Sequence, residues 1–84
     1  MDDYKNSVAA QLRAEISAAH MSVSEFVRRS GIPRPTLDRY LSGERDMPLG
    51  VLYKASEILG VEPPTILKRA HDRAEYSAKR SNDN

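Results

Sequence analysis

Residues 22–43, SVSEFVRRSGIPRPTLDRYLSG, place a glycine and two prolines between two arginine-bearing segments. Glycine adopts a left-handed backbone without a side-chain penalty and commonly ends helices. Proline lacks an N–H group, which costs nothing in a first helical turn because those donors have no intrahelical partner. We therefore expect Gly31 to end one helix and Pro33 and Pro35 to begin the next. Two short helices joined so tightly must cross at a steep angle.

The segment before this turn also has the pattern of helices. Val8, Leu12, Ile16 and Ala19 recur at helical spacing. This spacing predicts an amphipathic helix over residues 5–19. Its polar residues are expected to lie away from the apolar stripe: Gln11, Arg13 and Glu15.

A second helix is predicted from Ser22 to Gly31. Ser22 and Glu25 form the S-x-x-E pattern of a capping box, which begins helices. This helix is expected to turn Phe26 and Val27 inward and Arg28 and Arg29 outward.

Two further helices follow the turn. The third is expected to begin near Pro33 and to end at Ser42-Gly43, with an apolar stripe made of Leu37, Tyr40 and Leu41. The fourth is predicted between Pro48 and Gly60, with an apolar face made of Val51, Leu52, Ala55, Ile58 and Leu59.

A fifth helix is predicted from about residue 64, with Ile66, Leu67, Ala70 and Ala74 on its apolar side. The polar segment SAKRSNDN after Tyr76 is expected to fray. These patterns predict an all-α fold of five helices, with one domain over residues 1–76 and a polar tail over residues 77–84.

Composition limits the class of protein. A chain of 84 residues has room for one small domain and is too short for a deep substrate cavity. It has no cysteine, so a disulfide framework and a thiolate zinc site are excluded, and a cytoplasmic location is the simpler expectation. It has no apolar run long enough to span a bilayer.

Positive charge is concentrated around the turn although the formal net charge is only +1. Residues 21–45 hold five arginines against three acidic side chains, whereas residues 46–84 hold equal numbers of basic and acidic residues. Two short helices with outward arginines form the helix-turn-helix arrangement, whose second helix fits the major groove of DNA.

The sequence from Ser22 to Val61 resembles the phage Cro/repressor-type, or XRE-like, helix-turn-helix family. The resemblance is carried by Phe26, Val27, Gly31-Ile32, Leu37, Tyr40, Gly43 and the segment LYKASEILGV. It implies a compact five-helix domain that binds double-stranded DNA as a sequence-specific transcriptional regulator.

The resemblance also implies which residues meet DNA. The positions expected to read bases or reach adjacent phosphates are Arg34, Pro35, Thr36, Asp38 and Arg39. The positions expected to contact phosphates are Arg28, Ser42, Gly43 through its N–H, and Arg45. An arginine can make a bidentate pair with guanine, which supports a guanine in each half-site. The alternative for the arginines is surface ion pairing with nearby acidic residues, and Tyr40 is interpreted as a core residue.

The leading functional hypothesis is a small Cro-like repressor of phage or prophage origin that excludes polymerase from a promoter. A homodimer is expected, with the fifth helix as the contact; pairing only on DNA remains the alternative. Two other functions stay open: an antitoxin that also holds a toxin, and a module whose arginines bind an acidic protein. No cofactor, small-molecule ligand, membrane partner or enzymatic activity is expected, and His20 and His71 lie too far apart to indicate a metal site.

Overall fold

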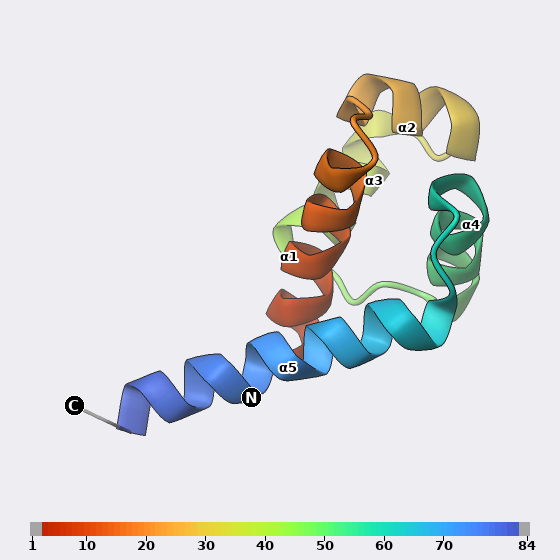
Figure 1. Ribbon diagram of the computed structural model, residues 1–84. Helices are drawn as coiled ribbons and strands as arrows, with labels where there is room; N and C mark the ends of the chain where they lie inside the picture. Colours follow the sequence, from red (N-terminus) through yellow and green to blue (C-terminus); the bar gives the residue numbers. More distant parts are fainter. Residues whose placement is uncertain (1–2, 83–84) are drawn as a thin grey trace.

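The computed structural model describes residues 3–82 of the chain, which form five helices (Figure 1). These are α1 (Asp3–Ala18), α2 (Val23–Ser30), α3 (Arg34–Ser42), α4 (Leu49–Leu59) and α5 (Pro63–Asn82). The predicted all-α fold of five helices is confirmed. α1 packs along α5 and against α3, while α2 packs against α3 and α4.

Local sequence chemistry explains where α2 and α3 begin and end. The Ser22 side chain accepts a hydrogen bond from the N–H of Glu25 at 3.0 Å, as expected for a helix cap. Gly31 ends α2 with a left-handed backbone, φ 73°, and its N–H donates to the carbonyl of Val27. Pro33 then stands at the N-cap of α3. The predicted helix, glycine turn and proline-headed helix are therefore confirmed.

The core lies where the first four helices meet. Its central cluster consists of Leu12, Ile16, Phe26, Leu37, Leu41 and Ala55. α5 adds a second buried stripe along α1, made of Ile66, Ala70 and Ala74. Tyr40 is buried, as interpreted from its position, whereas Leu67 of the predicted α5 stripe is 44% exposed. The apolar side of α5 is thus used largely to cover its own domain.

The prediction of which residues of the first helix are exposed is partly wrong. Gln11 and Glu15 are buried, and Ala19, expected in the apolar stripe, is exposed after the end of α1. The cause is α5, which lies against this side of α1 and brings two arginines to it. Arg69 Nη1 donates to Glu15 Oε2 at 2.8 Å, and Arg73 Nε donates to Gln11 Oε1 at 2.6 Å.

The Glu15 carboxylate is the centre of this α1–α5 network. It also accepts from Gln11 Nε2 at 2.6 Å. Burial alone would raise the pKa of Glu15, but the hydrogen bonds from Arg69 and Gln11 and the positive charges of Arg69 and Arg73 lower it below its ordinary value. The ionised form is therefore favoured in the folded state.

The stability that ionised Glu15 contributes is expected to disappear in acid. Because its folded pKa is depressed, the contribution is complete above the unfolded pKa, about 4.3, and is lost as pH falls through the lower folded value. Glu15→Gln should lower the free energy of unfolding by about 1.5–3 kcal/mol near pH 7 and by less at acidic pH. Urea unfolding of both proteins from pH 7 to pH 3 measures this convergence. A difference that stays constant over the range would contradict it.

Gly43 ends α3 at a crowded position. Its φ is 81°, and a Cβ at this site would lie 2.5 Å from Asn6 Oδ1 of α1. At Gly31, φ is also positive, but a Cβ would meet nothing within 4 Å. Substitution at Gly43 therefore meets backbone strain and the nearby Asn6 side chain, whereas substitution at Gly31 meets backbone strain alone.

We expect Gly31→Ala and Gly43→Ala each to cost about 1 kcal/mol of stability through backbone strain, because the atom closest to a Cβ at Gly43 is the end of the exposed Asn6 side chain, which can turn away. Thermal unfolding of the two variants measures both costs. Introducing Asn6→Ala should therefore change the cost of Gly43→Ala little. A clearly larger cost for Gly43→Ala that Asn6→Ala removes would show that the approach of α1 restricts Gly43.

The sequence left the end of the last helix open, and the structure places it at Asn82. α5 continues to Asn82, so the segment after Tyr76 that was expected to fray is helical up to that residue. Residues 83–84 of the predicted tail lie outside the described residues. Basic residues Lys79 and Arg80 in the last turn favour this end of the helix because its carbonyl groups carry partial negative charge. Figure 1 shows this half of α5 projecting beyond the other helices.

Candidate nucleic-acid interface

α3 is held by one face and exposes the other. Leu37, Tyr40 and Leu41 anchor it in the core. Pro35, Asp38, Arg39 and Ser42 are exposed on the remaining surface, Arg34 lies exposed at one edge of it, and Thr36 is half-buried. Because successive residues turn by about 100°, Arg34 and Arg39 stand on opposite sides of the exposed face, with Pro35 and Asp38 between them.

The turn before α3 and the far end of α3 are each held by a side chain to which the sequence analysis gave no such role. Ser30 Oγ donates to the carbonyl of Val27 at 3.3 Å and accepts from the N–H of Ile32 at 3.2 Å. At the other end of α3, Arg13 of α1 donates to the carbonyl of Leu41. A cation at a helix C-terminus is stabilising, so Arg13 helps to position α3. No local pattern in the sequence indicates this contact.

Arg34 contacts its own domain in the absence of DNA. Its Nε lies 3.2 Å from Asp38 Oδ1, one helical turn along α3, and its Nη1 donates to Ser24 Oγ of α2 at 3.3 Å. Asp38, one of the positions expected to read bases, therefore orients an arginine when no DNA is bound. The Arg34 side chain is nevertheless 52% exposed.

Arg39 is paired as well, but more loosely. Its Nε lies 3.7 Å from Glu44 Oε2 in the loop after α3, and both side chains are more than half exposed. Exposed ion pairs of this kind contribute about 0–1 kcal/mol. A bidentate arginine–guanine pair contributes about 1–3 kcal/mol of discrimination. An arginine–guanine pair is therefore strong enough to replace the exposed contacts that Arg34 and Arg39 make within the domain.

Two positions expected to bind phosphate, Ser42 and Gly43, also have local roles. The Ser42 hydroxyl donates to the carbonyl of Arg39 at 3.1 Å and accepts from the N–H of Glu44 at 3.2 Å. The N–H of Gly43, which is buried, donates to the carbonyl of Tyr40 at 3.2 Å. These hydrogen bonds give Ser42 and Gly43 a role in ending α3, and their expected contacts with phosphate stay a prediction.

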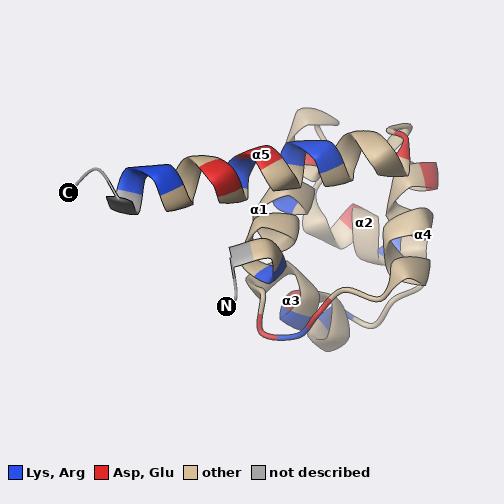
Figure 2. Cartoon of the chain, turned by 90° about the horizontal axis from the view of Figure 1, so that it is seen from below, with Lys and Arg blue, Asp and Glu red and all other residues tan. Residues whose placement is uncertain are grey.

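Arg28 and Arg45 keep the properties expected of phosphate-binding residues. Arg28 is exposed on α2, and Arg45 is exposed in the loop between α3 and α4. Among the side chains of residues 4–80, neither guanidinium forms an ion pair. Arg29, in contrast, is paired with Glu25 at 3.0 Å. Figure 2 shows basic residues at α3 and at the loop that follows it, on the side of the molecule away from α5.

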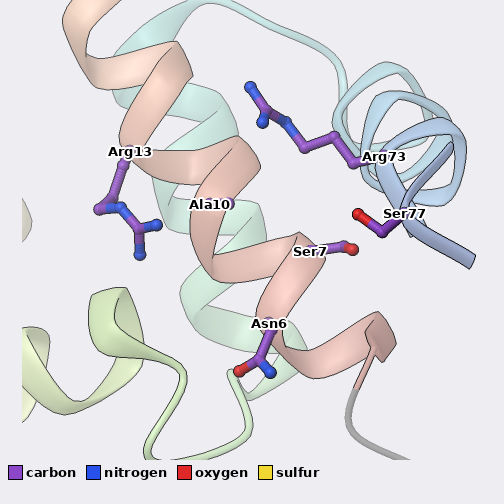
Figure 3. A pocket seen from close by; sticks show the side chains of 6 residues that line it. All are labelled: Asn6, Ser7, Ala10, Arg13, Arg73 and Ser77. Atoms are coloured by element: carbon purple, nitrogen blue, oxygen red, sulfur yellow. The ribbon is translucent and has the colours of Figure 1, made fainter. Parts of the chain in front are cut away.

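A hollow between α1 and α5 lies outside this surface. It is lined by Asn6, Ser7, Ala10, Arg13, Arg73 and Ser77. Figure 3 shows that the two guanidinium groups on its wall do not point toward one another. One is bound to the end of α3 and the other to Gln11, so both serve contacts between helices.

Comparison with known proteins agrees with this geometry. The profile of one family, the Cro/C1-type HTH DNA-binding domain, matches residues 11–72, a range that runs from α1 into α5 and includes α2, the turn and α3. No curated protein and no solved structure matches the chain. Within residues 3–82, none of the helices has the length and apolar character needed to cross a membrane. The family match covers most of the chain and contains the whole helix-turn-helix, and the chain therefore belongs to the Cro/C1-type HTH DNA-binding domain family, as a DNA-binding transcription regulator.

Proposed function

We propose that the protein is a sequence-specific repressor that inserts α3 into the major groove of an operator. The observation that carries this proposal is the exposed face of α3, with Arg34 and Arg39 at its two sides and each held only by exposed polar contacts. Arg34 and Arg39 read guanine edges, Pro35 meets a thymine methyl group, and Thr36 meets a thymine methyl group or a neighbouring phosphate. Arg28 and Arg45 contact phosphates on either side.

Two copies of the chain are needed for a two-fold operator. The recognition helices of such dimers lie about 34 Å apart, one turn of the double helix. One chain has a single α3 and therefore presents only one reading helix. We infer a homodimer on DNA. Bound over a promoter, it represses by excluding polymerase, as a small Cro-like protein of a phage or prophage would.

The salt dependence of duplex binding tests this function against the alternative that the arginines bind an acidic protein. Each phosphate neutralised on B-DNA contributes about 0.9 to the slope of log affinity against log salt concentration. Arg28→Gln and Arg45→Gln should each weaken binding to all duplexes and, because the dimer carries each substitution twice, reduce the slope by about 2. Fluorescence anisotropy at several salt concentrations measures both. Slopes that match the wild type in both variants would remove these residues from the interface.

A further inference from the structure

Two polar side chains hold the Arg34 guanidinium in one orientation beside the exposed face of α3. Asp38 Oδ1, one helical turn along α3, accepts from Nε at 3.2 Å, and Ser24 Oγ of α2 accepts from Nη1 at 3.3 Å. The two acceptors thus come from different helices and bind different nitrogens of one planar group. Since a planar group bound at two nitrogens has little freedom to rotate, the direction of its remaining N–H groups is set before DNA binds.

The donors that remain on Arg34 are those that a guanine requires. A guanidinium carries five N–H groups in a planar fork. Within the described residues, Asp38 and Ser24 use one each, which leaves three N–H groups on the terminal nitrogens Nη1 and Nη2. A bidentate contact with guanine needs one N–H for O6 and one for N7. Arg34 can therefore read a guanine while it keeps both contacts within the domain.

Arg39, the other arginine of this surface, is not oriented in the same way. Its Nε lies 3.7 Å from Glu44 Oε2, which is beyond hydrogen-bond distance, and Glu44 belongs to the loop after α3. The Arg39 side chain must therefore be ordered when DNA binds, which costs conformational entropy. Arg34 has lost part of this entropy already in the free domain.

We propose that Ser24 and Asp38 are positioning residues that set the base preference of Arg34. Because their contacts stay in place on DNA, less entropy is lost when the guanidinium binds a guanine. A base that does not accept two hydrogen bonds in the same direction leaves the fixed donors unpaired, which makes the wrong base more costly. This inference rests on the proposed function, in which Arg34 lies at a base edge in the major groove.

Asp38 has a second effect, because its carboxylate is exposed and negatively charged. A negative charge close to the phosphates weakens binding to every sequence. Asp38 thus lowers the affinity for duplexes in general and raises the preference for one base. A residue that served only the folding of α3 would not act on these two quantities in opposite directions.

Ser24→Ala and Asp38→Ala test the proposal on the duplex that the wild type selects and on copies with one guanine replaced in one half-site. Arg34→Ala identifies the guanine that Arg34 reads. Ser24→Ala and Asp38→Ala should each reduce the preference for this guanine by about two- to tenfold, the cost of ordering one long side chain on binding. The preference at the position read by Arg39 should not change. Asp38→Ala should also bind random duplexes more tightly than the wild type.

Two further variants are matched controls. Ser24→Thr keeps the hydroxyl group and should keep the preference for guanine. Glu44→Ala removes one negative charge beside Arg39, as Asp38→Ala does beside Arg34, but it removes no side-chain hydrogen bond and should change no base preference. Fluorescence anisotropy measures the affinities, and thermal unfolding of the same preparations checks that each variant is folded.

A preference at the Arg34 position that stays unchanged in either Ser24→Ala or Asp38→Ala would overturn the inference, as would an equal loss at the Arg39 position. If Arg34→Ala still removed the guanine requirement, the proposed function would stand without the inference. A wild type with no guanine requirement would overturn both.

Discussion

Phe26→Ala is expected to lower the free energy of unfolding by about 3–5 kcal/mol, the usual cost of removing a buried phenylalanine ring. Phe26 is 0% exposed and belongs to the cluster formed with residues of α1, α3 and α4. Native domains are stable by only about 5–15 kcal/mol, and a domain of this size stands at the low end. A large part of the variant should therefore be unfolded in water. Urea denaturation followed by circular dichroism measures the loss.

Leu67→Ala is the matched control, because Leu67 lies on α5 and is 44% exposed. Its loss of stability should be well below that of Phe26→Ala. Phe26→Leu, which keeps most of the apolar volume, should fall between the two. A loss under about 1 kcal/mol for Phe26→Ala would mean that Phe26 does not lie in the packed core formed by α1, α2, α3 and α4.

Arg39→Ala is expected to weaken binding to the preferred duplex by about 5- to 150-fold for each guanine contact, which corresponds to about 1–3 kcal/mol per contact, and the two-fold dimer loses two such contacts. Its exposed pair with Glu44 is too weak to hold the guanidinium away from the groove. Removing Arg39 costs the folded domain little for the same reason, so the loss appears in binding and not in unfolding. Anisotropy titrations and thermal unfolding of the same preparation separate these effects.

Arg29→Ala supplies the control for charge. Arg29 is an exposed arginine on α2 that is paired with Glu25, and it lies outside α3. It should weaken binding much less than Arg39→Ala and should leave the base preference unchanged. Equal losses for the two variants would indicate a general effect of positive charge and would remove the specific role of Arg39.

Helix boundaries were predictable because the signals are local. Ser22 caps α2 through the N–H of a residue three positions later, and Gly31 and Gly60 end helices with a left-handed backbone that favours glycine. Pro33 and Pro48 stand at the N-caps of α3 and α4 for an equally local reason. Such features depend on a few neighbouring residues, so they can be recognised without knowing how the helices pack.

The buried polar network was not predictable in this way. Gln11 and Glu15 are polar residues of the kind that usually lie on a solvent-exposed helix face, and only the approach of α5 buries them. The position of Gly43 beside Asn6 likewise depends on how α1 crosses the end of α3. Both features join residues far apart in the sequence, and a single sequence does not show which of its helices lie side by side.

The candidate DNA-binding surface shows the same division. The exposed side of α3 follows from its apolar stripe, and the Arg34–Asp38 pair follows from their spacing of one helical turn. The contacts of Arg34 with Ser24 and of Arg39 with Glu44 depend on the turn and the loop that flank α3. The end of α3 at Ser42-Gly43 was predicted from the sequence, whereas the bond from the Ser42 hydroxyl to the carbonyl of Arg39 became evident only from the structure.

Selection of bound sequences from random duplexes, performed in parallel with the wild type, Arg34→Ala and Arg39→Ala, tests most directly whether α3 reads bases. We predict a two-fold symmetric site for the wild type, with guanine required at specific positions of each half-site. Each variant should lose the guanine requirement at one of these positions and keep the others. The same selected sequence from all three proteins, or no preferred sequence from the wild type, would contradict base reading by α3.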